Sequence, residues 1–209
     1  MNLEQLVQIG IHMAELAEVD ARLTAMEALD IDSIFCLKTA LVVLANVADL
    51  EPSLRSTYKV QPEPSQIIKP LKRQLTFAKY LRNKYVGHIH PQLITKAIEW
   101  NPIILHSSGR LTDPQYVTIL NLWLLETTIN TYVDDNGKHK LFDGETDLMY
   151  PPDWKRFLDF LEQAVRGSLS YLKLLDQIWA PTLVPPDAGT VDLEAYLKAG
   201  RTVFGFLKQ

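Results

Sequence analysis

Three side chains in one short segment of the chain, Arg82, Asn83 and His88, have chemistries that complement one another. A histidine imidazole, with an ordinary pKa of about 6.5, can accept the proton of an RNA 2′-hydroxyl. An arginine guanidinium stays charged at any accessible pH and can hold a phosphate while negative charge builds on it. An asparagine amide can orient the histidine or a phosphate oxygen. Together they suggest metal-free cleavage of RNA, with His88 as base, Arg82 as phosphate stabiliser and Asn83 as positioner.

The surroundings of these residues are basic. No Asp or Glu occurs between Glu63 and Glu99, whereas the whole chain carries a formal net charge of −4. That net charge excludes a protein that coats nucleic acid with its whole surface, so any contact with RNA must be local. The cations of the segment can attract a phosphate backbone by neutralising it and releasing its counterions. The candidate RNA- and phosphate-binding residues among them are Lys72, Arg73, Lys79 and Lys84.

Arg82 lies close to the centre of an apolar sector of its predicted helix, formed by Leu71, Leu75, Ala78, Tyr85 and Ile89. A guanidinium there is costly unless it is paired or lies at a cleft or a subunit interface. His88 lies toward the edge of the same sector, but six residues are not a whole number of helical turns. The two side chains therefore converge only if the helix loosens near Gly87 and Pro91, or if a second copy of the helix faces the first.

The run from Leu81 to His88 resembles the signature of the HEPN superfamily, whose members are α-helical bundles in which Arg and a polar residue precede a His. Here the order is Arg-Asn, four residues, then His, the form typical of the ribonuclease branches. The resemblance implies a metal-independent endoribonuclease without a cofactor, with Arg82 and His88 as the catalytic pair and Asn83 as their polar companion. It also implies a homodimer whose two motifs form one composite cleft.

The resemblance further implies a role in toxin–antitoxin or phage-defence systems, with RNA and a cognate antitoxin protein as partners. At the level of the motif it covers residues 65–100. One position departs from the pattern, because members paired with a nucleotidyltransferase antitoxin often carry a Tyr two residues after the His. This chain has His90 there, so the branches that resemble abortive-infection proteins are closer.

Two other classes of function stay open for the same residues. The first is a non-catalytic helical module that binds a nucleotide, RNA or a protein partner through the same basic cleft. The second is an interaction protein in which Arg82 forms a buried salt bridge, for instance to Glu126 or Asp49. In that case the basic segment is a solvated helix face whose cations pair with acidic residues of neighbouring helices.

A metal site is not expected, although His88 and His90 form the pattern His-x-His. On a helix two such imidazoles point about 200° apart. No carboxylate stands nearby to complete a ligand set.

Apolar periodicity and turn signals predict an all-α protein, an up-and-down bundle of four to five main helices with an extra C-terminal helix. Asn2, Asp113, Asp153 and Asp192 are the expected N-caps. The division predicted is a HEPN-like bundle over 1–180, a proline-containing linker over 181–191 and a helix over 192–209 that packs on the bundle or on a second subunit. Helices are expected from residue 3 to the mid-twenties and over 32–48, 65–90, 92–100, 114–133, 154–179 and 193–207, with a loop and a short hairpin over 138–152.

Composition and the chain start predict a soluble cytoplasmic protein. The single cysteine, Cys36, allows no intrachain disulfide and fits a reducing compartment. The first residues lack the pattern of a secretion signal. No later stretch is expected to reach the roughly 20 apolar residues of a membrane span.

Overall fold

The computed structural model describes residues 1–110, 112–183, 197–198 and 200–201. Within them there is no β-strand beyond one isolated bridge between Val133 and His139. The predicted all-α class is confirmed. The α-helices are α1 (Leu3–Thr24), α2 (Ile31–Leu54), α3 (Glu63–Leu81), α4 (Pro91–Trp100), α5 (Pro114–Asn130) and α6 (Pro151–Trp179). Shorter helical turns are η1 (Arg55–Lys59), the π-turn η2 (Arg82–Val86), η3 (Pro102–Arg110) and η4 (Ala180–Thr182).

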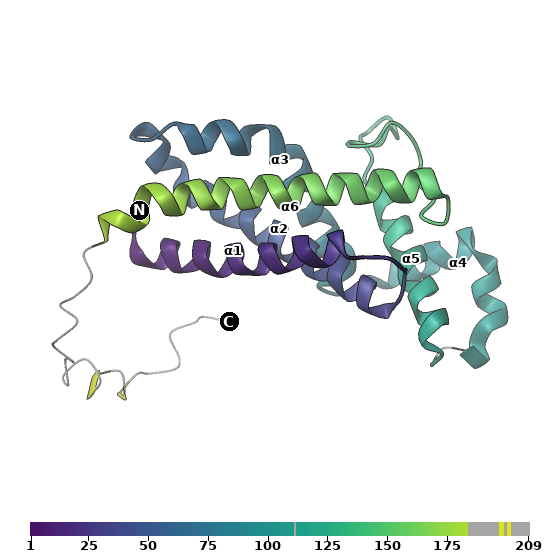
Figure 1. Ribbon diagram of the computed structural model, residues 1–209. Helices are drawn as coiled ribbons and strands as arrows, with labels where there is room; N and C mark the ends of the chain where they lie inside the picture. The colour runs from purple at the N-terminus through teal and green to yellow at the C-terminus, as the bar shows by residue number, and fades with distance from the viewer. Residues whose placement is uncertain (111, 184–196, 199, 202–209) are drawn as a thin grey trace.

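Four long helices, α1, α2, α3 and α6, run side by side, and α4 and α5 lie at one end of them (Figure 1). α6 packs against both α1 and α3, while α2 packs against α1 and α3 and contacts α5. Among the described helices α2 has the most buried residues, 13 of its 24. It therefore forms the centre of the core, which explains its nearly continuous apolar sequence.

α2 and η1 together, Ile31–Lys59, are also long and apolar enough to cross a membrane, with a mean hydropathy of 1.7 over their most apolar 18 residues. The expectation that no stretch reaches this level is therefore wrong. Because 56% of that apolar window is buried inside the bundle, its composition is that of a core helix. A single such helix does not indicate a membrane protein.

Of the four predicted N-caps, two are confirmed, and Asp192 lies outside the described residues. Asn2 and Gln5 form a capping box at α1, and the side chain of Asp113 accepts the backbone N–H of Gln115 at α5. The prediction for Asp153 is wrong, because α6 begins at Pro151 rather than after that residue. A proline suits the first helical turn, where its missing N–H would have no partner in any case.

The third helix ends earlier than predicted. α3 passes through Pro70 without a break but stops at Leu81, and η2 follows it. His88 consequently lies beyond the last helical residue rather than within a helix reaching residue 90. Pro91 accounts for the extended backbone of His90, because a proline disfavours helical backbone in the residue before it. His90 is extended, with φ −67° and ψ 128°, and Pro91 opens α4.

The segment between α5 and α6 begins with a tight hairpin. The backbone N–H of Asp134 donates to the Lys138 carbonyl (2.8 Å), and that of Lys140 donates to the Tyr132 carbonyl (2.9 Å). Gly137 turns the chain with a φ of 76°, in the left-handed region that favours glycine. The hairpin thus lies over residues 132–140, largely before the stretch 138–152 for which it was suggested.

The side chain of His139 stabilises this loop through hydrogen bonds to backbone groups. Its Nδ1 accepts the backbone N–H groups of Leu141 (3.1 Å) and Phe142 (2.8 Å), so Nε2 carries the proton and donates to the Ile129 carbonyl (3.0 Å). Burial, joined by the charge of Arg156, lowers the pKa of His139. A neutral imidazole is the form that these hydrogen bonds require.

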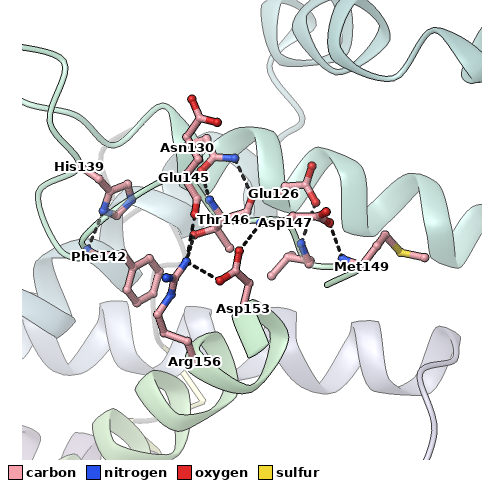
Figure 2. Close-up of polar contacts among 11 residues, drawn as sticks. Glu126, Asn130, His139, Phe142, Glu145, Thr146, Asp147, Met149, Asp153 and Arg156 are labelled. Atoms are coloured by element: carbon pink, nitrogen blue, oxygen red, sulfur yellow. Dashed lines mark hydrogen bonds and ion pairs between the residues drawn. The ribbon is translucent and has the colours of Figure 1, made fainter. Parts of the chain in front are cut away.

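The rest of the loop is held by polar contacts to α5 and α6 (Figure 2). Asn130 exchanges two hydrogen bonds of 2.8 Å with the backbone of Thr146. Arg156 pairs with Asp153 (3.0 Å) and donates to the Glu145 carbonyl (3.1 Å). The loop therefore has a defined shape, which matters because it carries Lys140.

The predicted linker over 181–191 and the C-terminal helix over 192–209 lie almost entirely outside the described residues. Both stay predictions. The described bundle ends with η4, directly after α6.

Candidate active site

The motif residues lie on and just after η2, the π-turn that ends α3. The backbone N–H of Gly87 donates to the Arg82 carbonyl over five residues (2.8 Å), one residue more than an α-helical turn encloses. Turns of this kind are rare and occur frequently at functional sites. Asn83, Lys84 and His88 are exposed, so three polar members of the motif face solvent.

Tyr85 anchors the π-turn in the core. Its side chain is 1% exposed, and its hydroxyl donates to Oδ1 of Asn121 on α5 (3.0 Å). The same Oδ1 accepts Nζ of Lys38 (2.7 Å), whose ammonium lies 4.8 Å from the centre of the Tyr85 ring. Burial raises the pKa of Tyr85 and lowers that of Lys38.

Sequence reasoning missed this anchor. The available signal was Lys38 itself, a single cation in the apolar sequence of α2. A partly buried cation needs a polar partner, but nothing in the sequence connects it to Asn121, 83 residues later.

Arg82 is held by a carboxylate of α2. Its Nη2 lies 2.7 Å from Oδ2 of Asp49, while its Nε is buried without a hydrogen-bond partner. Lys79 pairs with the other oxygen of Asp49. Partial burial raises the pKa of the Asp49 carboxyl, but the hydrogen bonds and charges of Lys79 and Arg82 outweigh it, so the pKa lies below its usual value.

The Arg82–Asp49 pair is one of the two salt bridges that the interaction-protein hypothesis names. It is not fully buried, because 28% of the Arg82 side chain and 42% of the Asp49 side chain are exposed. The other named partner, Glu126, instead accepts the backbone N–H of Leu148 (2.8 Å).

His88 is not joined to Arg82 by any hydrogen bond or ion pair within the described residues. Its ring neighbour is His90, with a distance of 6.2 Å between ring centroids. Within one chain, the two predicted catalytic side chains are therefore near in sequence, Arg82 on η2 and His88 just after it, but they are not a bonded pair.

The predicted phosphate-binding residues divide into two groups. Lys72 pairs with Glu51 of α2 (3.3 Å), and Lys79 pairs with Asp49. Arg73 donates to the Lys140 carbonyl (2.6 Å) instead, and Lys84 lines a cavity. The pairing of basic side chains with acids of a neighbouring helix is therefore observed for Lys72 and Lys79, and is not observed for Arg73 and Lys84.

The cavity beside the motif has a volume of about 450 Å³ and lies between the end of α3, α4 and the end of α5. Lys84, His90 and Lys96 contribute positive or titratable groups to its wall, and Tyr80 contributes an aromatic face. Its single lining carboxylate, Glu99, pairs with Lys96 (2.6 Å). The wall is thus suited to an anion.

The part of the chain that the structure describes contains no group of three or more His, Cys, Asp or Glu side chains placed to hold a metal ion. No protein-family model matches the chain, and no curated protein or solved structure matches it. The resemblance to the HEPN superfamily therefore rests on the motif itself and stays a prediction.

Proposed function

We propose that this protein is a HEPN-like, metal-independent endoribonuclease that acts in the cytoplasm. One observation supports the proposal most: η2 leaves Asn83 and Lys84 exposed, His88 is exposed two residues after it, and Asp49 holds Arg82 at the start of the same turn. Within the motif segment, Lys84 lines a cavity whose wall carries little negative charge, while Arg82, Asn83 and His88 are not among its lining residues. Positioned cations of this kind stabilise charge that develops on a phosphate.

In the proposed reaction His88 accepts the proton of a 2′-hydroxyl, and the 2′-oxygen attacks the adjacent phosphorus. The bond from phosphorus to the 5′-oxygen breaks, and that oxygen takes a proton from solvent or from a second imidazolium. The products are a 2′,3′-cyclic phosphate and a 5′-hydroxyl. Arg82 offsets the charge that builds on the phosphate, and Asn83 orients the phosphate or the imidazole.

A homodimer belongs to the same proposal. Because Arg82 and His88 form no bonded pair in one chain, a second copy that faces the first would supply the missing partner to each. Such an enzyme would act on RNA as a toxin or a phage-defence effector in an abortive-infection or toxin–antitoxin system, held in check by a cognate antitoxin protein.

The test is cleavage of a labelled single-stranded RNA by the purified protein in the presence of a chelator. We expect chelator-resistant cleavage with a cyclic-phosphate end, lost in Arg82→Ala and in His88→Ala. His106→Ala and Arg22→Ala are matched controls, because both replace an exposed residue of the same type outside the motif. Cleavage that persists in His88→Ala would refute the assignment of the base.

A second candidate function is the non-catalytic module that binds RNA, a nucleotide or a protein through the same cleft. It is favoured by the Asp49 contact, because a guanidinium already paired with a carboxylate has less capacity to hold a phosphate. Binding of the labelled RNA without any cleavage would select this candidate.

A further inference from the structure

A second basic cavity lies further back along α3, where the hairpin after α5 packs against the helix. Its volume is about 260 Å³, and it is lined by Lys72, Arg73, Thr76, Tyr132 and Lys140. No carboxylate of the described residues lines it. Since Glu51 pairs with Lys72, Arg73 and Lys140 supply the positive charge that stays available to a ligand.

The position of Lys140 is fixed by its surroundings. Its carbonyl accepts Nη2 of Arg73 (2.6 Å), its backbone N–H donates to the Tyr132 carbonyl, and its ammonium lies 5.5 Å from the centre of the Tyr132 ring. His139 holds the next residues of the loop. The two cations are therefore presented together, although Arg73 and Lys140 are 67 residues apart.

Two tyrosines separate this cavity from the one beside the motif. Tyr132 lines the cavity at Lys140, and Tyr80 lines the cavity beside the motif. Their ring centroids are 4.8 Å apart. Thr131, which also lines the cavity beside the motif, hydrogen-bonds to the Tyr80 hydroxyl (2.9 Å). The two cavities thus meet across a pair of contacting aromatic rings.

We infer that the two cavities and this tyrosine pair form one binding groove for single-stranded RNA. Arg73 and Lys140 hold the backbone at one end, a base packs against Tyr80 or Tyr132, and Lys84 holds the backbone at the end that leads to His88. Alternation of cations with aromatic faces is how proteins bind single strands, because every unpaired base has a face that can stack. A duplex keeps its bases stacked inside and cannot use the tyrosines.

This inference rests on the proposed function for its substrate class and adds the path that the substrate follows. The inference also divides the predicted phosphate-binding residues into two sets. Lys72 and Lys79 are paired with α2 carboxylates and lie outside the set that holds the strand. Lys140 joins that set although it stands outside the acid-free segment.

The experiment measures the affinity of the full chain for a fluorescent single-stranded 2′-O-methyl RNA, which has no free 2′-hydroxyl to react. Lys140→Glu is compared with Lys138→Glu, which makes the same charge change two residues earlier in the same hairpin but does not line either cavity. We expect Lys140→Glu to weaken binding about tenfold or more. The slope of log affinity against log salt concentration should become shallower by the amount that about one to two phosphate contacts contribute. Lys138→Glu should weaken binding less than about threefold.

Tyr80→Leu tests the stacking part of the groove while keeping an apolar side chain against Tyr132. It should weaken binding of the base-bearing strand by about fivefold or more and leave an abasic strand of the same length unaffected. Circular dichroism of each variant establishes that the helical fold is retained.

Equal losses in Lys140→Glu and Lys138→Glu would overturn the groove, as would a duplex that binds as tightly as the single strand. The outcome is separable from that of the proposed function. RNA cleavage by the wild type with normal binding by Lys140→Glu rejects the groove and keeps the nuclease. Binding that depends on Lys140 without any cleavage keeps the groove and rejects the nuclease.

Discussion

The two sides of α3 carry similar cations and differ in what those cations meet. Toward α2, Lys72, Lys79 and Arg82 pair with Glu51 and Asp49. We call this the paired side of α3. A cation that is already matched by a carboxylate contributes little to the attraction of a phosphate.

A second side faces α5 and the hairpin that follows it, and Lys72, although paired with Glu51, also lines the cavity there. There Arg73, Lys84 and Lys140 form no ion pair with the described residues, and they line cavities with aromatic walls. We call this the open side. The comparison shows that the number of lysines and arginines in a segment does not measure the charge available to a ligand, because neighbouring helices neutralise part of it.

The largest expected effect is on the rate of RNA cleavage and concerns His88, the exposed last residue of the motif. Removal of a general base typically lowers a rate by about 10² to 10⁴, so His88→Ala should reduce RNA cleavage by that factor. The free energy of unfolding of this variant should differ from that of the wild type by less than about 0.5 kcal/mol, as for most surface substitutions. The kinetics of cleavage measure the loss of rate, and a thermal melt measures the change in stability. A large fall in Tm would show that His88 has a structural role instead.

The anchor beneath the motif should give the next largest effect. Tyr85→Phe removes the hydrogen bond to Asn121, whose Oδ1 keeps its contact with Lys38, and should lower the free energy of unfolding by about 1 kcal/mol. Denaturant unfolding measures this change. Tyr80→Phe is the comparison variant, because it removes a hydrogen-bonded tyrosine hydroxyl on α3, just before η2, from a less buried side chain.

The paired side should contribute modestly to stability, in a way that depends on pH. The pKa of Asp49 is lowered in the folded protein, so its contribution is present above the unfolded pKa of about 3.9 and is lost as the pH falls through the folded pKa. Asp49→Ala should cost about 1 kcal/mol or less at pH 7, since both side chains are partly exposed. The cost should vanish at strongly acidic pH. An equal cost at both pH values would contradict the ion-pair explanation.

The smallest effect should come from Glu126, a partly buried carboxylate with no cation bound to it. Burial raises its pKa, the hydrogen bond from the Leu148 N–H opposes this, and the charges of Asp147 and Asp153 add to the rise. A raised pKa means that stability is lost as the pH rises from the unfolded pKa through the folded one.

Glu126→Gln keeps an oxygen acceptor for Leu148 and removes the buried charge. We expect it to raise the Tm at pH 7 by a few degrees at most, which corresponds to less than about 1 kcal/mol. At pH 4, where the wild-type side chain is largely protonated, the two proteins should melt at nearly the same temperature. A lower Tm for Glu126→Gln at pH 7 would show that the carboxylate charge is needed for the loop contact.

Much of the fold was predictable because it depends on local sequence. Apolar periodicity located every described α-helix, and the caps at Asn2 and Asp113 follow from side chains that bond to the next turn. The start of α6 was misplaced because the helix begins at Pro151, and α3 ends earlier than predicted because the π-turn η2 replaces its last turns. At these two helix ends, apolar periodicity does not determine the first or last helical residue.

The candidate site was predictable in its residue types and much less in its arrangement. Arg82, Asn83 and His88 could be selected because their functional groups and spacing are properties of the sequence. The anchor of Tyr85 on Asn121 and the approach of Lys140 to Arg73 could not be predicted, since each joins residues on different elements.

The amino-acid sequence by itself determined the helices, the acid-free run of cations and the presence of the motif, since all of these arise from neighbours along the chain. The tertiary structure alone decided which cations are neutralised and which line a cavity. The physical reason is that electrostatic attraction depends on distance in space, and Asp49 reaches Arg82 across 33 residues of chain only because α2 packs beside α3.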